Sequence, residues 1–177
     1  RMAGASGDRL YGQAFQVAAE ELGAGESFFL RAFEFRRFEG FNGDGNPEAK
    51  LKEVFLNIYA TASPPGTAID FSYPGSLPSG CEFVGSSTKG IDLAVPRNAT
   101  LRWTFNDLPL ERERFYLAVL STDRGPGNHV GAGLKLAGDP GPDWHNHPGG
   151  FGGALITGSP SPERAAWFQA ELVPGKR

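Results

Sequence analysis

Short apolar runs separated by turn residues make up most of the chain. Around Trp103 the apolar residues Leu101, Trp103 and Phe105 alternate with polar ones, which is typical of a strand with one buried face. The strand-like runs are Ser27–Phe38, Val54–Ala62, Thr67–Tyr73, Glu82–Gly85, Gly90–Val95, Thr100–Asn106, Phe115–Thr122, Val130–Leu136, Ala154–Thr157 and Ala166–Val173. They predict an all-β protein, an antiparallel β-sandwich or jelly roll of about eight to ten short strands.

The N-terminal segment Leu10–Leu22 is harder to assign from its sequence. Its alanines and glutamates favour a helix, whereas the alternating Phe15 and Val17 favour a strand. We predict a strand, because the following run Ser27–Phe38 is rich in phenylalanine. A turn at Gly23–Gly25 would then join the two strands as a hairpin.

The run Ser27–Phe38 carries apolar side chains at both odd and even positions. Phe28 and Leu30 fall on one parity, and Phe33 and Phe35 fall on the other. In a regular strand these two sets would lie on opposite faces. A β-bulge near Phe33 would place them on the same face.

The segment Asp123–Pro162 differs in composition from the rest of the chain. Of the 25 glycines and 14 prolines in the protein, 11 glycines and 6 prolines lie in these 40 residues, together with all three histidines. Loops of this length are uncommon in compact domains unless they bind a ligand or partner or are mobile. The chain length suits one domain. We therefore predict a single domain over residues 1–177, with 123–162 as its loop-rich candidate functional region.

One chemical possibility in this region is a metal site. His145 and His147 form a His-x-His pair, whose imidazoles would point to the same side of an extended segment. Imidazole is a common ligand of zinc and other transition metals. His129 or Asp143 could supply a third ligand and leave one position open for water. A solvated polar loop is the alternative interpretation of the same residues.

A second possibility is a ligand surface built on exposed aromatic side chains. Trp144 and Phe151 lie among polar and glycine residues, and Asn146 adds an amide beside them. Aromatic rings on loops of this kind commonly stack on sugars or anchor a protein partner. Trp103 and Trp167 instead occupy alternating runs and are predicted to be core residues.

Two further features of the sequence indicate a structural role rather than a metal site or a reactive group. Asn42, Asp44 and Asn46 place oxygen ligands at alternate positions, as a calcium loop does, but Pro47 replaces the glycine of its sharp turn. A plain turn is therefore favoured over a calcium site. The single cysteine, Cys81, has no histidine beside it and is predicted to be a half-buried structural thiol.

Two short segments resemble known families. Residues 145–148 resemble the His-x-His-Pro core of JAMM-type metallopeptidases, but the serine and acid that the family places further on correspond here to Leu155 and Gly158. The resemblance therefore implies no peptidase. Thr100–Thr122 resembles a strand pair of AidA/PixA-type inclusion-body proteins, with an Arg-Trp pair, a polar turn and an apolar strand. This resemblance implies a sandwich and no functional residue.

Charge and cysteine content narrow the class of protein. The net charge is −3, and the arginines occur in small groups beside acidic residues, so a nucleic-acid partner is not expected. No apolar run approaches the roughly 18 residues that cross a bilayer, so no transmembrane segment is predicted. One cysteine excludes an intrachain disulfide and favours a soluble, cytoplasmic protein, the alternative being an extracellular protein large enough to be stable without disulfides.

These observations leave two main function hypotheses and, as a third possibility, a structural subunit of a larger assembly such as a capsid or tail jelly roll. The first is a non-enzymatic β-sandwich module whose loops 123–162 bind a small ligand, a glycan or a protein partner, or mediate homo-oligomeric assembly. It rests on the absence of a catalytic motif and on Trp144 and Phe151. The second is a metal-dependent enzyme centred on His145 and His147.

Overall fold

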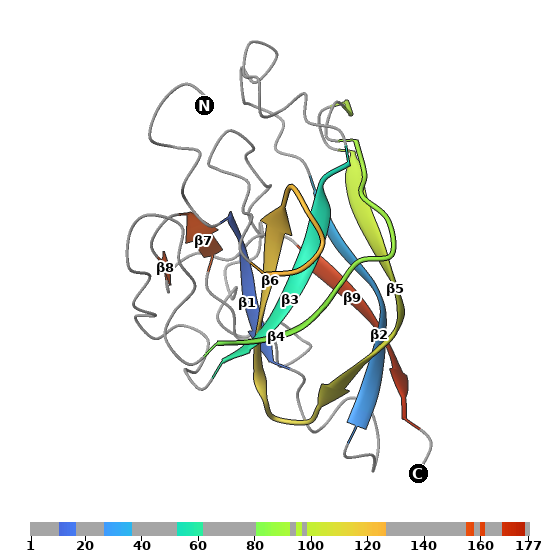
Figure 1. The fold of residues 1–177 in the computed structure, drawn as a ribbon, viewed down its shortest axis with the longest axis vertical. Helices are drawn as coiled ribbons and strands as arrows, with labels where there is room; N and C mark the ends of the chain where they lie inside the picture. The colour runs from blue at the N-terminus through green and yellow to red at the C-terminus, as the bar shows by residue number, and fades with distance from the viewer. Residues whose placement is uncertain are drawn as a thin grey trace, which may run out of the picture.

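The computed structural model describes residues 11–16, 27–36, 53–61, 81–92, 95–96, 99–126, 155–157, 160–161 and 168–175. These residues form two antiparallel sheets and no helix (Figure 1), which confirms the all-β prediction. Their strands are β1 Tyr11–Gln16, β2 Ser27–Arg36, β3 Phe55–Thr61, β4 Glu82–Ser86, β5 Thr100–Glu111, β6 Phe115–Ser121, β7 Leu155–Thr157, β8 Pro160–Ser161 and β9 Phe168–Pro174. Within these residues there is no helix long and apolar enough to cross a membrane.

The larger sheet has six strands in the order β4-β3-β6-β1-β7-β8, and the smaller has three in the order β5-β2-β9. Strands β3 and β6 are apolar at nearly every position, and their residues are buried on both faces. Such continuous apolar runs are typical of central strands. In agreement with this, each of the two strands has a hydrogen-bonded neighbour on both sides.

A β-bulge in β2 resolves the mixed parity of this strand. Between Leu30 and Ala32, β2 has one residue more than its partner β9, whereas its other partner β5 has two residues more than β2. Because of this bulge, the residues before and after it contribute to one core face, and Phe28, Leu30, Phe33 and Phe35 are all fully buried. The predicted bulge is therefore confirmed, two residues before Phe33. The bulged residue Arg31 is exposed and forms an ion pair with Asp107 at 2.9 Å.

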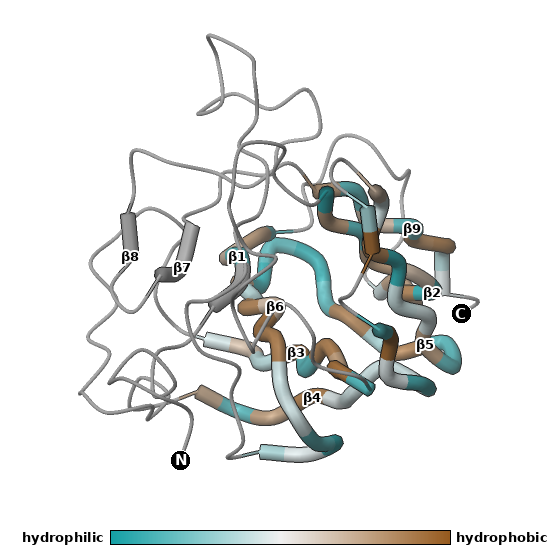
Figure 2. Tube along the Cα trace, turned by 90° about the horizontal axis from the view of Figure 1, so that it is seen from above, coloured by the Kyte–Doolittle hydropathy of each residue, from teal (hydrophilic) through white to brown (hydrophobic). Residues whose placement is uncertain are grey.

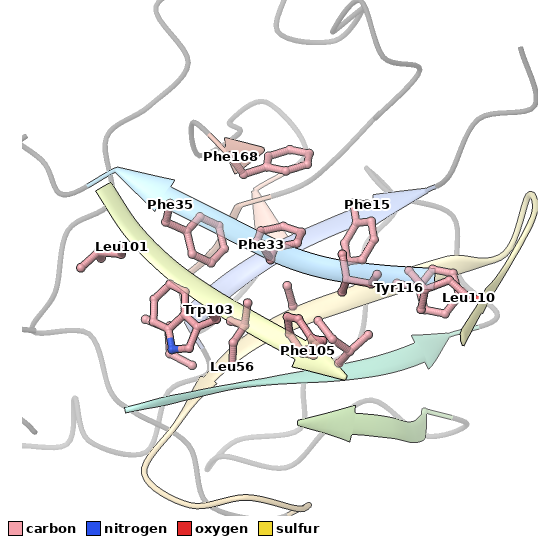
Figure 3. Close-up of a cluster of buried hydrophobic side chains, with 14 of the residues drawn as sticks. Phe15, Phe33, Phe35, Leu56, Leu101, Trp103, Phe105, Leu110, Tyr116 and Phe168 are labelled. Atoms are coloured by element: carbon pink, nitrogen blue, oxygen red, sulfur yellow. The ribbon is translucent and has the colours of Figure 1, made fainter. Parts of the chain in front are cut away.

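The hydrophobic core contains side chains from both sheets (Figure 3). Phe15 of β1 contacts Phe33 of β2 and Phe168 of β9, with ring centroids 5.3 and 6.4 Å apart. Phe33 stacks on Phe168 at 5.3 Å. The Trp103 Nε1–H of β5 donates a hydrogen bond to the Val54 carbonyl oxygen, just before β3, at 2.8 Å. Aromatic rings from both sheets therefore meet in one hydrophobic core.

The predicted alternation of β5 is also confirmed. Leu101, Trp103 and Phe105 are buried, whereas Arg102 and Thr104 between them are exposed. Apolar and polar residues accordingly follow one another along this strand (Figure 2). The strand is longer than predicted and extends to Glu111.

One prediction about strand pairing and one predicted strand are wrong. β1 and β2 do not form a hairpin, because β1 pairs with β6 and β7 in one sheet, while β2 pairs with β5 and β9 in the other. Their phenylalanines meet across the core rather than along a shared ladder. The described residues of Gly90–Val95 form only an isolated bridge, Ile91 with Val54. Runs Thr67–Tyr73 and Val130–Leu136 lie outside the described residues.

Candidate functional site

The residues predicted from the sequence to carry function lie outside the described part of the chain. This applies to the aromatic and amide candidates Trp144, Asn146 and Phe151, to the metal candidates His129, Asp143, His145 and His147, and to the calcium candidates Asn42, Asp44 and Asn46. The core prediction for Trp167 also lies outside it. Among the residues that are described, no group of three or more His, Cys, Asp or Glu could hold a metal ion. All these candidate sites stay predictions.

The structure does describe where the candidate region begins, at Asp123–Pro126 directly after β6. The buried Asn57 of β3 reaches this segment from the neighbouring strand. Its Nδ2 donates a hydrogen bond to the Gly125 carbonyl oxygen at 2.8 Å and makes a longer one to the Asp123 carbonyl oxygen at 3.4 Å. The start of the loop-rich region is therefore attached to a central strand of the larger sheet.

Ser86 at the end of β4 completes this attachment. Its hydroxyl donates to the Asn57 Oδ1 at 2.6 Å and accepts from the Gly125 N–H at 3.0 Å. Both backbone polar groups of Gly125 are thus bound by side chains. Gly125 has a φ of 98°, a conformation that glycine adopts readily and other residues rarely do. We call Asn57, Ser86 and Gly125 the loop clamp.

Local hydrogen bonds shape the residues that lead to the clamp. The Asp123 N–H donates to the Oγ of Ser121, the last residue of β6, at 3.3 Å. The Arg124 N–H donates to the Asp123 carboxylate at 2.7 Å. The bond from Asp123 to the serine hydroxyl two residues earlier has the spacing of a Ser turn, which turns the chain as it leaves the strand. Together with the clamp, these bonds define the path of the backbone from Ser121 to Gly125.

The clamp lies on the face of the larger sheet that points away from the smaller one. Leu56 and Ile58 of β3 belong to the core between the sheets, so Asn57 and Tyr59 point to the opposite face. Asn57 pairs with Val119 of β6 on that face, and all three residues Asn57, Tyr59 and Val119 are fully buried. Ser86 and Gly125 are half-buried, so the clamp bonds are partly shielded from water, and leaving the fully buried Asn57 amide without partners would be costly.

The sequence contains one local signal for Asn57. Asn57 is a single amide in the otherwise apolar stretch Phe55–Ala60. A polar side chain buried in such a strand must find hydrogen-bond partners, so it marks a specific contact. Ser86 and Gly125 carry no such signal, because serine and glycine are frequent throughout the chain.

Charged side chains on the smaller sheet form ion pairs with each other. Arg102 of β5 bonds to Glu34 of β2 and, at 2.6 Å, to Glu171 of β9. The hydrogen bonds from Glu34 and Glu171 raise the pKa of Arg102 above its usual value. Exposed ion pairs of this kind contribute at most about 1 kcal/mol each.

Cys81 is half-buried beside β4, as the sequence predicts. Burial raises the pKa of its thiol, and a hydrogen bond with Thr61 opposes part of this shift. Because the thiolate is the reactive form, we expect Cys81 to react with Ellman's reagent at pH 8 more than about fivefold slower than free glutathione. Unfolding in guanidinium should abolish the difference. An equal rate in the folded protein would contradict the structural role.

Comparison with known proteins gives no further assignment. No protein-family model matches the sequence, and neither the curated proteins nor the solved structures include a significant match.

Proposed function

We propose that the protein is a non-enzymatic β-sandwich module for binding or assembly, whose loop-rich region 123–162 contacts a glycan, another small ligand or a protein partner. The observation that supports this proposal is the loop clamp, through which Asn57 and Ser86 attach the start of the region to the larger sheet. Binding loops are characteristically carried by a rigid scaffold that positions them. The shared aromatic core of the two sheets supports a sandwich as that scaffold.

The ligand contacts proposed for this region are aromatic. Trp144 and Phe151 supply rings suited to stacking on a sugar face or filling a pocket of a protein partner, and Asn146 supplies an amide for hydrogen bonding. An aromatic residue that is one of the few hot spots of an interface contributes about 2 kcal/mol or more. A few such rings are enough to dominate the affinity of a loop surface.

The proposal is tested by replacing the aromatic anchors. We expect Trp144→Ala and Phe151→Ala each to weaken binding at least about tenfold, which corresponds to 1.4 kcal/mol. Binding is measured on a glycan array and assembly by light scattering. Phe83→Ala is the matched control, since Phe83 is an exposed aromatic residue on β4, outside the region. The control should bind and assemble as the wild-type protein does.

Two results would contradict this function. One is unchanged glycan binding and unchanged assembly in both aromatic variants. The other is stoichiometric transition metal in the purified protein that is lost in His145→Ala and His147→Ala, because this would favour the metal-dependent enzyme. Thermal shifts with added Zn²⁺, Ni²⁺ or Cu²⁺ provide an independent measurement of the same point.

A further inference from the structure

The hydrogen bonds of the loop clamp use the polar groups of its two side chains in one consistent arrangement. The Asn57 amide has two N–H donors for the two carbonyl oxygens of Asp123 and Gly125, and its oxygen accepts from Ser86. The Ser86 hydroxyl has one proton, which it gives to Asn57, and a lone pair, which accepts from the Gly125 N–H. Turning the amide over would place its oxygen against two carbonyl oxygens. The arrangement therefore admits a single orientation of Asn57.

A bulge in β4 brings the clamp residues together. Asn57 and Tyr59 lie two positions apart on β3, but their partners on β4 are Ser86 and Phe83, three positions apart, with the register shift between them. In a regular strand, residues three apart lie on opposite faces. The extra residue lets Ser86 share the outer face of the sheet with Asn57, in the way that bulges re-aim side chains.

We propose that Asn57 and Ser86 are positioning residues for the binding region, because they fix the direction in which the chain leaves β6 by holding both backbone groups of Gly125. The inference rests on the proposed function in assigning ligand binding to region 123–162. The clamp reduces the number of conformations available to the first residues of this region. Pre-organising a binding loop in this way raises affinity by lowering the entropy lost on binding.

The chain offers a matched pair of variants to test this role. Ser87 is also buried, and its hydroxyl accepts from the Leu56 N–H and donates to the Lys89 carbonyl oxygen. Ser86→Ala and Ser87→Ala thus remove the same group from neighbouring positions, but only Ser86 touches Gly125. We expect amide hydrogen exchange at Gly125 to be at least tenfold faster in Ser86→Ala, compared with the Leu120 amide of β6. Ser87→Ala should leave this ratio unchanged.

Two further variants separate positioning from general stability. Ser86→Thr keeps the hydroxyl and should restore slow exchange at Gly125, at least in part. Asn57→Ala should accelerate exchange at Gly125 as Ser86→Ala does. If Asn57→Ala fails to fold, the serine variants still decide the question. Unfolding in urea provides the global stability of each variant for comparison.

Binding is then measured with the array glycan that the wild-type protein binds most strongly, or by light scattering if it only self-associates. Ser86→Ala should weaken this interaction at least about threefold, and Ser87→Ala should not. Unchanged exchange at Gly125 in Ser86→Ala would overturn the clamp, and faster exchange with unchanged binding would overturn its positioning role. Trp144→Ala should weaken binding without affecting exchange at Gly125. If Trp144→Ala and Phe151→Ala both bind normally, the proposed function fails, whereas the exchange result still decides the clamp.

Discussion

Replacing Trp103 by alanine should lower the free energy of unfolding by about 3–5 kcal/mol. The indole is fully buried and contacts Phe35 of β2 edge-to-face, with ring centroids 6.0 Å apart. Its Nε1–H also donates to the Val54 carbonyl oxygen on the opposite sheet. Alanine would therefore leave a cavity between the sheets and remove a hydrogen bond that joins them.

A second variant separates these two contributions. Trp103→Phe retains much of the ring but removes the N–H, and should cost about 1–2 kcal/mol. The loss is limited because the Val54 carbonyl oxygen also accepts from the Ile91 N–H at 2.9 Å. Urea unfolding followed by far-ultraviolet circular dichroism measures both variants.

The control for this series is Asn106→Ala on the same strand. Asn106 is exposed, so its removal should change the stability by no more than about 0.5 kcal/mol. If Trp103→Ala costs less than about 1.5 kcal/mol, the indole cannot be the packed link between the sheets that the structure shows. A control that is as unstable as Trp103→Ala would point to a general sensitivity of β5.

The all-β class and the facing of single strands could be predicted from the sequence because both depend on local patterns. The alternation around Trp103 and the parity change in β2 can be recognised from residues that are adjacent in the sequence. The sheet that each strand joins cannot be recognised in this way. Phe15 of β1 faces Phe33 across the core, yet an apolar strand followed by a glycine turn and a second apolar strand is equally compatible with a hairpin.

The candidate site, too, could be predicted from the sequence only in part. The loop-rich region 123–162 stands out by composition, since its glycines, prolines and histidines are adjacent in sequence. The loop clamp depends on the pairing of β3 with β4 and on the bulge that places Ser86 beside Asn57. Residues 29 and 68 positions apart in the chain make these hydrogen bonds, so no local pattern could reveal them beyond the single buried amide.

The second large effect is expected at Gly90, which lies close to the hydrogen bond between the Trp103 indole and the Val54 carbonyl oxygen. A Cβ at this position would lie 2.5 Å from the Glu53 carbonyl carbon and 2.6 Å from its Cα. These are backbone atoms, and Glu53 is already held at a φ of 59°. The next residues, Val54 and Ile91, exchange two backbone hydrogen bonds of 2.9 Å each. Gly90→Ala must therefore push this bridge apart, and should cost about 3 kcal/mol.

Gly85→Ala is the matched control for Gly90→Ala. Its Cβ would come 2.4 Å from the Leu108 Cδ1, which is as close, but the atom is the end of a flexible side chain that can rotate. We expect a cost of about 1 kcal/mol, measured by the same urea unfolding. Equal costs for the two glycines would show that the bridge between Val54 and Ile91 yields as easily as a leucine side chain.

The two predictions are coupled through the Val54 carbonyl oxygen, which accepts from both Ile91 and Trp103. Displacing the bridge in Gly90→Ala moves the acceptor of the indole, so part of the value of the Trp103 hydrogen bond is already lost in that variant. The double variant Gly90→Ala with Trp103→Phe should therefore be more stable than the sum of the single effects predicts, by at least about 0.5 kcal/mol. Strict additivity would mean that the Val54–Ile91 bridge and the Trp103 indole stabilise the protein independently of each other.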